Sequence, residues 1–386
     1  MRPAGEFPAR WTEITHRRPR RRGGRPGKNV RECRLLPHWP GLASRLLCSP
    51  RVDSEQVVEI RVPGELTHRT ASMAARLIWE QLAMAPPRLW LNVESVKSVD
   101  AVGLAVLAQA TARASAAGTT TTIFPSPIVY NALFASGLLD RLPTDKRRAT
   151  ERPEPDRIVE VDAPRSVEFL AQTPRLGLRP PTWEELRLLN QWAHDAALDE
   201  LVGSQLLAMC RHLGPYHPDF VTEAMASPIA LTLLVQPRHP GAEPVGFVRL
   251  YGVNLDQRFL FLETTIAQPR GRRVAWGIEA TRLACAYSVE ALGIERIETK
   301  VYAYNTLSAN SLKRNGFTLE GTLRQARMHG GRRWDILVFG ILEPEIRDAL
   351  AGDGFAAMGF WSSPAAPLSD SADATPAPSS FASASA

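Results

Sequence analysis

The stretch FLFLETTIAQPRGRRVA, residues 259–275, decides the fold of the C-terminal half of the chain. Its first part, from Phe259 to Ile266, is apolar and rich in β-branched and aromatic residues, which predicts a strand. Apolar residues at helical spacing from about Val274 to Leu292 predict a helix after it. The glycine-containing turn between them, around Gly271, offers backbone N–H groups and the positive end of the helix dipole. We therefore expect this turn to bind a pyrophosphate.

Two features further along the chain support this interpretation of the turn. Asn305 opens the sequence Asn-Thr-Leu-Ser, and the pair Gly316-Phe317 follows it. The order of strand, glycine turn, helix, Asn and Gly-Phe resembles the GNAT superfamily of acyl-CoA-dependent N-acetyltransferases. Within that superfamily it is most similar to the RimJ/RimL-like branch, which modifies ribosomal-protein N-termini and amino sugars. The resemblance covers about Leu176 to Glu345 and implies acetyl-CoA as cosubstrate.

In that family the turn reads Gln/Arg-x-x-Gly-x-Gly/Ala, and residues 270–275 follow it except at Arg273, where the family has its central glycine. A guanidinium there can pair with phosphate, but it replaces a small residue that lets the backbone approach. Asn305 sits where relatives contact the cofactor, and it is equally suited to N-cap the helix that follows. The resemblance implies cofactor contacts from Ile266, Arg270, Gly271, Arg272, Arg273, Val274, Ala275, Asn305 and Ser308.

Acetyl transfer to an amine needs a base, because a protonated amine cannot attack a thioester carbonyl. By resemblance we expect Glu263, on the strand before the turn, to take the amine proton directly or through water. The alternative for Glu263 is a carboxylate that faces solvent or pairs with an Arg. Asp335 matches an Asp frequent in this branch, and we count it with Glu263 among the candidate catalytic residues, for structural pairing or for recognition of the amine.

Many family members carry a Tyr at the position of Leu312, as the acid that protonates the leaving thiolate. Tyr302 and Tyr304 precede this helix, and we expect them to point elsewhere. Either the thiolate leaves without a protein acid or water supplies the proton, and a catalytically weak domain is an open alternative.

The rest of this half predicts a mixed sheet with helices. Thr182 and Glu185 have the spacing of a capping box that opens a helix. By resemblance, the strand that begins at Phe259 and the one at residues 296–302 part from each other, so that the pantetheine arm of CoA lies between them. Further strands are expected at residues 229–235, 245–251 and 332–342, and short helices at 195–204 and 219–225.

The region from about Glu55 to Pro143 alternates strand and helix patterns, which predicts a sheet covered by helices. Strands are expected at residues 57–62, 88–93 and 119–124, and helices at 67–85 and from about Leu104 to Gly118. Ser126 followed by Pro127 predicts the start of a third helix, with Ser126 as its N-cap.

Residues 64–66, 98–104 and 136–139 of this region resemble the STAS domain of anti-sigma-factor antagonists. In switching members of that family, a Ser at a helix N-terminus accepts phosphate from a kinase. The two serine positions are Ala101 and Val102 here, and neither side chain has a hydroxyl. The family also often has Asp at the position of Thr67. The resemblance therefore implies a docking or structural module for a protein partner rather than a phospho-switch.

The net charge of +6 is unevenly distributed. Residues 1–50 hold 12 Lys and Arg against 3 Glu and carry +9, which leaves −3 for the rest of the chain. This tail is expected to be a disordered extension. Contact with nucleic acid or anionic lipid is the less favoured interpretation, because no aromatic stacking pattern accompanies the arginines.

No apolar run approaches the length of a membrane span, and the N-terminus lacks the apolar region of a secretory signal. The four cysteines form no CxxC pair, so we expect neither a metal site nor a disulfide framework. A cytoplasmic location fits this cysteine usage best.

We therefore expect an α/β (α+β) protein made of an Arg-rich tail (1–50), a STAS-like domain (54–145), a linker (146–172), a GNAT domain (173–347) and an Ala/Ser/Pro-rich tail (348–386). The expected function is acetyl transfer from acetyl-CoA to a primary amine of a protein N-terminus, an amino sugar or an aminated metabolite. The alternative is a non-catalytic interaction protein whose GNAT domain senses acyl-CoA and whose STAS-like domain binds a partner.

Overall fold

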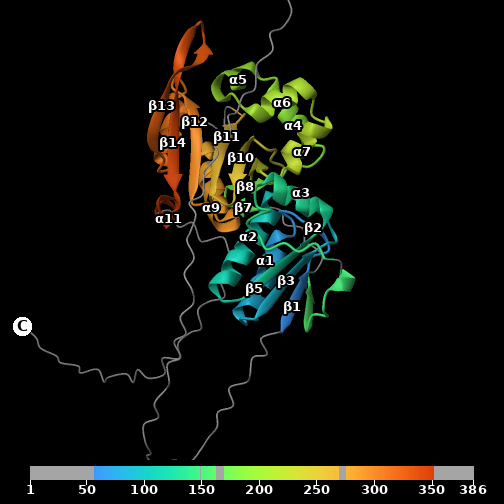
Figure 1. Ribbon diagram of the computed structural model, residues 1–386. Helices are drawn as coiled ribbons and strands as arrows, with labels where there is room; N and C mark the ends of the chain where they lie inside the picture. The colour runs from blue at the N-terminus through green and yellow to red at the C-terminus, as the bar shows by residue number, and fades with distance from the viewer. Residues whose placement is uncertain (1–55, 148, 162–168, 269–274, 352–386) are drawn as a thin grey trace, which may run out of the picture. The chain divides into compact units, whose positions relative to one another are not determined.

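The computed structural model describes residues 56–147, 149–161, 169–268 and 275–351 (Figure 1). The predicted tail at residues 1–50 and the segment from residue 352 onward lie outside the described residues. Within those residues, the chain forms a four-stranded sheet, an eight-stranded sheet and a separate pair of strands. The predicted α/β (α+β) fold class is confirmed.

The N-terminal domain is built on a parallel sheet with strand order β5-β3-β1-β6. A second parallel pair joins β2 and β4. The predicted strands and helices of this region are all present. Its elements are β1 (Val57–Arg61), β2 (Gly64–Leu66), α1 (Ala71–Ala83), β3 (Arg88–Val93), β4 (Val96–Val99), α2 (Ala101–Ala116), β5 (Thr120–Pro125), α3 (Pro127–Ala135), the short 3₁₀ helix Ala149–Glu151 and β6 (Arg157–Glu160).

Local sequence explains how these helices begin and pack. Ser126 caps α3 through its side chain, as predicted. A Cβ at Gly103 would lie 1.8 Å from the carbonyl oxygen of Leu66, so α2 can approach β2 this closely only with glycine at that position. The apolar face of α1 is buried, and it includes Ala71, Ala74, Ala75, Ile78 and Leu82.

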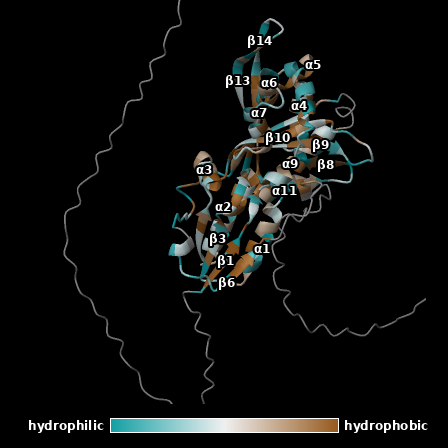
Figure 2. Cartoon of the chain, turned by 90° about the vertical axis from the view of Figure 1, so that its right-hand side faces the viewer, coloured by the Kyte–Doolittle hydropathy of each residue, from teal (hydrophilic) through white to brown (hydrophobic). Residues whose placement is uncertain are grey.

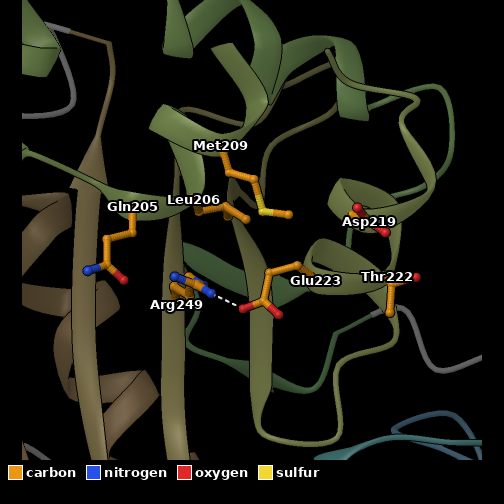
Figure 3. Close-up of a pocket in the computed structure, with 7 residues that line it drawn as sticks. All are labelled: Gln205, Leu206, Met209, Asp219, Thr222, Glu223 and Arg249. Carbon is orange, nitrogen blue, oxygen red and sulfur yellow. Dashed lines mark hydrogen bonds and ion pairs between the residues drawn. The ribbon is translucent and has the colours of Figure 1, made fainter. Parts of the chain in front are cut away.

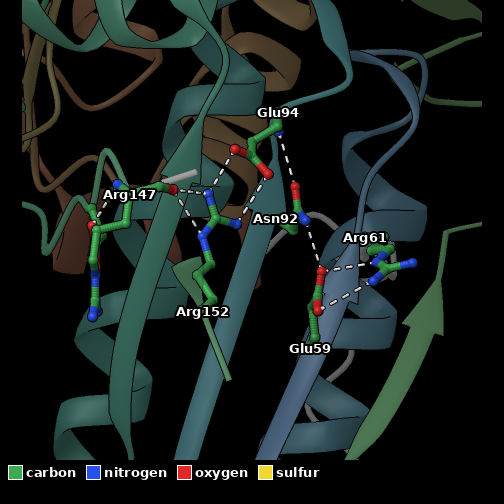
Figure 4. A network of polar contacts seen from close by, with 7 residues as sticks. Glu59, Arg61, Asn92, Glu94, Arg147 and Arg152 are labelled. Atoms are coloured by element: carbon green, nitrogen blue, oxygen red, sulfur yellow. Dashed lines mark hydrogen bonds and ion pairs between the residues drawn. The ribbon is translucent and has the colours of Figure 1, made fainter. Parts of the chain in front are cut away.

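Strand β6, which the sequence did not predict, lies in the segment expected to be a linker and pairs with β1. A polar network joins β1 and β3 to the segments around Glu94 and Arg152 (Figure 4). Buried Glu59 accepts hydrogen bonds from Arg61 at 2.8 Å and Asn92 at 2.7 Å. Arg152 forms a two-pronged ion pair with Glu94. The sheet of the first domain thus extends beyond residue 145.

The C-terminal domain has an eight-stranded sheet of order β13-β14-β12-β11-β10-β9-β8-β7. Its strands pair antiparallel except β11 with β12, which run parallel. Its elements are β7 (Ala171–Gln172), β8 (Leu176–Arg179), α4 (Leu186–Ala193), α5 (Ala196–Val202), α6 (Gln205–Leu213), α7 (Pro218–Met225), β9 (Ala230–Pro237), β10 (Gly246–Asn254), β11 (Phe259–Ile266), α9 (Trp276–Leu292), β12 (Arg296–Tyr302), α10 (Thr306–Arg314), β13 (Thr318–His329), β14 (Arg332–Leu342) and α11 (Glu343–Ala351).

Helices cover both faces of this sheet. Leu250 of β10 and Leu262 of β11 share an apolar core with α9. Phe247, whose position in β10 has the opposite parity, packs instead with residues of α4, α6 and α7. Since side chains alternate along a strand, Arg249 and its cross-strand partner Glu263 lie on the α4–α7 face.

Two helix starts of this domain follow from the sequence, and four of its elements do not. Thr182 and Glu185 make the reciprocal hydrogen bonds of the predicted capping box, at 2.9 and 3.3 Å. Asp195 caps α5 as the predicted helix boundary implies. Strand β7, helix α6, strand β13 and helix α11 were not predicted. β7 lies in the segment expected to be a linker, and α11 runs into the segment expected to be a tail. Strand β13 is largely hydrophilic and exposed (Figure 2).

Candidate active site

The two parallel strands at the centre of the sheet part from each other. β11 pairs with β12 only from Phe259 to Phe261, opposite Arg296 to Glu298. Beyond this point β11 stays paired with β10 as far as Ile266, and β12 stays paired with β14 as far as Tyr302. The ends of β11 and β12 therefore flank a V-shaped opening. Backbone N–H and C=O groups that have no hydrogen-bond partner on a neighbouring strand can bind an extended ligand there.

Glu263 lies on β11 where the opening has begun. Arg249 stands opposite it on β10, and Thr265 donates a hydrogen bond to its carboxylate at 3.3 Å. Burial raises the pKa of Glu263 above its ordinary value, and this effect is opposed by a hydrogen bond from the Ser204 hydroxyl, the charge of Arg249 and the bond from Thr265. A carboxylate with a raised pKa is suited to accept a proton from an amine.

Ser204 is a site residue that the sequence analysis missed. It is the N-cap of α6, where its Oγ accepts a hydrogen bond from the backbone of Leu207 at 3.3 Å. Its hydroxyl also lowers the pKa of Glu263. Gly203 before it ends α5 in the left-handed conformation, with φ +61°. A glycine followed by a serine is a helix-stop and helix-start signal, so the sequence did contain evidence for this turn.

A pocket of about 320 Å³ adjoins Arg249 on the same face of the sheet (Figure 3). The Arg249 guanidinium is buried and forms an ion pair with Glu223 of α7. Within the described parts of the chain, its Nε has no hydrogen-bond partner. The pocket wall carries two carboxylates against one guanidinium, so it favours a ligand with positive charge. The lining residues are Gln205, Leu206, Met209, Asp219, Thr222, Glu223 and Arg249.

The expected pyrophosphate turn is described only at its two ends. Ile266 ends β11 and its side chain lies next to Gly277 in the first turn of α9. Ala275 precedes α9 in the left-handed conformation, with φ +63°, and its carbonyl accepts a hydrogen bond from Ile278 at 3.0 Å. The predicted ligands Arg270, Gly271, Arg272, Arg273 and Val274 lie outside the described residues.

Asn305 is the N-cap of α10. Its Oδ1 accepts a hydrogen bond from Ser308 N at 3.1 Å, and its Nδ2 donates to the carbonyl of Leu201 at 3.0 Å. Asn305 thus ties α10 to α5 as well as capping a helix. A contact of Asn305 or Ser308 with the cosubstrate stays a prediction.

Asp335 holds the β13–β14 hairpin together. Its Oδ1 accepts a hydrogen bond from Gln325 N at 2.8 Å. Gln325 has φ +52° and lies where the register between the two strands shifts. The structural pairing considered for Asp335 is therefore present, and a part in catalysis stays a prediction. Among the described residues, no group of three or more His, Cys, Asp or Glu side chains could hold a metal ion.

Comparison with known proteins identifies both domains. Residues 175–318 match the family model described as an acetyltransferase (GNAT) domain. Residues 51–151 match the STAS domain model. The chain joins a STAS domain to a GNAT acetyltransferase domain. These matches confirm the two resemblances predicted from the sequence. They also confirm the prediction of an N-acetyltransferase with acetyl-CoA as its cosubstrate. The RimJ/RimL-like branch stays a prediction.

Solved structures similar to the GNAT domain include a spermidine N-acetyltransferase from Vibrio cholerae in complex with CoA and spermine. It is 18% identical with a TM-score of 0.39, and the match covers 45% of this chain and 99% of that one. A putative acetyltransferase is 19% identical with a TM-score of 0.37, over 47% of this chain and 89% of its own.

In the STAS domain, the two positions at which switching relatives carry serine offer no group that could be phosphorylated. Ala101 and Val102 are buried at the start of α2 and have no hydroxyl. Asp100 before them accepts hydrogen bonds from Val102 N and Gly103 N, both at 3.0 Å, and from His68 at 2.8 Å. Its carboxylate therefore caps α2.

No helix among the described residues is long and apolar enough to span a membrane.

Proposed function

We propose that this protein transfers the acetyl group of acetyl-CoA directly to a primary amine, with Glu263 as the base. The observation that carries this proposal is the place of Glu263, on β11 where that strand parts from β12 and opposite Arg249. Its raised pKa lets it take the amine proton closer to neutral pH. The opening beside it can hold the thioester in line with the amine, which supplies most of the remaining rate gain.

The cosubstrate would bind along the opening and reach the N-terminal end of α9. A helix of 17 residues presents the backbone N–H groups of its first turn and a positive dipole end there. We assign its pyrophosphate to the turn from Arg270 to Ala275, between Ile266 and the helix. Asn305 and Ser308 complete the proposed contacts.

The acceptor amine would enter from the pocket beside Arg249. Asp219 and Glu223 in its wall favour a substrate with positive charge. A protein N-terminus, an amino sugar and an aminated metabolite all satisfy this condition. The STAS domain, which lacks a phosphate-accepting hydroxyl, would dock a protein partner. Cys210 and Cys285 are buried free thiols, in keeping with the cytoplasmic location that we propose.

Two measurements test the proposal. Isothermal titration of the full chain with acetyl-CoA should show binding, and release of free CoA should appear against a panel of peptide N-termini, amino sugars and polyamines. Absence of acetyl-CoA binding would contradict the proposal outright.

The second candidate function is a non-catalytic sensor of acyl-CoA that signals through the STAS domain. The observation that favours it is Leu312, which is buried in α10 where many relatives carry a Tyr. Binding of acetyl-CoA without release of CoA to any amine in the panel would support this alternative.

A further inference from the structure

Tyr302 occupies the open end of the V between β11 and β12. It is the last residue of β12 and pairs only with Ile336 of β14. Along β12, Tyr302 and Lys300 alternate with buried Thr299 and Val301. The Lys300 ammonium lies 5.2 Å from the ring centroid of Phe261, which shares a strand face with Glu263. Tyr302 and Glu263 therefore project from the same face of the sheet.

One turn of backbone contacts both side chains. A Cβ at Gly203 would lie 1.9 Å from the Tyr302 Oη, so this hydroxyl lies against the Gly203 backbone. The next residue, Ser204, lies close enough to Glu263 for its hydroxyl to lower the pKa of that carboxyl. This differs from the expectation that Tyr302 points away from the site.

Neighbouring side chains fix the ring and keep its hydroxyl protonated. The Arg327 guanidinium lies 4.6 Å from the Tyr302 ring centroid, and the Tyr304 ring stacks against it at 5.4 Å. Burial raises the pKa of Tyr302, and the nearby charges of Asp199 and Glu263 raise it further while Arg327 lowers it. The phenol can thus donate a proton at neutral pH.

We propose that Tyr302 is the acid that protonates the leaving CoA thiolate. It would take the role that many relatives give to a Tyr at the position of Leu312. This inference rests on the proposed function. The amine nitrogen forms a bond to the thioester carbonyl carbon and gives its proton to Glu263. The C–S bond breaks, and the sulfur takes the proton of Tyr302 Oη. After the products leave, the protonated Glu263 restores the phenol, so the net transfer is one proton from amine to thiol.

The test compares Tyr302→Phe with Tyr251→Phe in the full chain. Tyr251 is a matched control, because it is also partly buried and in electrostatic contact with Glu263, but it stacks on Phe261 at the paired end of the strands. With acetyl-CoA, Tyr302→Phe should lower kcat about 100-fold, the lower end of general acid catalysis, while KM changes little. Tyr251→Phe should stay within about threefold of wild type on the same scale.

Two further measurements separate a proton donor from a merely structural residue. An aromatic thiolate leaves without the help of an acid. With an acetyl donor that carries such a leaving group, the loss of kcat in Tyr302→Phe should therefore largely disappear. The fall of kcat at alkaline pH, expected when Tyr302 ionises, should also be absent in this variant. Equal losses with both donors and an unchanged alkaline limb would overturn the proposal. A wild-type chain that releases no CoA would instead contradict the proposed function itself.

Discussion

Arg249 and Glu263 stand directly opposite each other on β10 and β11, and Arg249 at the same time holds Glu223 of α7. The pair combines burial, which favours the neutral carboxyl, with a positive charge, which favours the carboxylate. Burial prevails, and the pKa of Glu263 is raised. A half-buried acid with this balance has a pKa that single substitutions can move in either direction.

Glu263→Gln should slow turnover by about 100-fold or more, because the amide cannot take the amine proton. It should also change how stability depends on pH. A raised pKa means that the folded chain binds more protons than the unfolded chain between the ordinary and the raised pKa of Glu, so wild-type stability falls as pH rises through that window. Denaturant unfolding at several pH values should show this fall in wild type and its loss in Glu263→Gln. An identical pH dependence in both would contradict the environment assigned to Glu263.

Arg249→Met should move the acid limb of the kcat profile to higher pH, because Glu263 loses the charge that lowers its pKa. It should also cost about 1–3 kcal/mol of stability, since partners of a buried ion are left unpaired. Arg258→Met is the control: its pair with Glu295 is half exposed on both sides and is worth at most about 1 kcal/mol. If the two variants behaved alike in both assays, Arg249 would not tune the site.

Gly203→Ala should destabilise the chain and slow turnover, because the new methyl group meets the Tyr302 hydroxyl. The left-handed backbone adds about 1 kcal/mol of strain. In the Tyr302→Phe background the closest contact is removed, and the nearest remaining atom is the ring carbon Cζ at 2.8 Å, so the cost of the alanine should be smaller. A double-mutant cycle of unfolding free energies measures the difference. Additive costs would show that the Gly203 backbone and the Tyr302 hydroxyl are not in contact.

Asp335→Ala should lower stability by about 0.5–1.5 kcal/mol, the net value of one hydrogen bond, because Gln325 N loses its acceptor. Asp335→Asn keeps an acceptor oxygen and should retain both stability and turnover. Thermal unfolding and CoA release of the two variants show whether Asp335 acts only on stability or also on turnover. Loss of turnover in the stable Asn variant would mean that the negative charge of Asp335 acts on the substrate.

The sequence predicted the elements whose residues carry their own pattern. β3, β11, β12 and β14 have the predicted boundaries because apolar runs and turn residues define them. β13 was missed because its mostly exposed side chains have no apolar alternation, and backbone pairing with β14 holds it in the sheet. β6 is likewise exposed along most of its length and is held by β1.

The candidate site could be predicted only in part for a similar reason. Glu263 was named as a candidate base from its strand and from the family resemblance, because the position of a residue on a strand is a local property of the sequence. Its neighbours Ser204 and Arg249 come from α6 and β10, and nothing in the sequence near Glu263 indicates them. Tyr302 was dismissed from its position before α10, because the turn that brings Gly203 against its hydroxyl depends on the packing of α5 and α6 on the sheet.

The most direct test of the central claim is the rate of CoA release from acetyl-CoA by wild type and Glu263→Gln, measured side by side against the amine panel. Acetyl-CoA binding by both chains is confirmed in the same preparations by titration. The account predicts amine-dependent release by wild type and a rate about 100-fold lower for the variant, with equal acetyl-CoA affinity. Equal release rates, or no amine-dependent release by wild type despite tight binding, would contradict it.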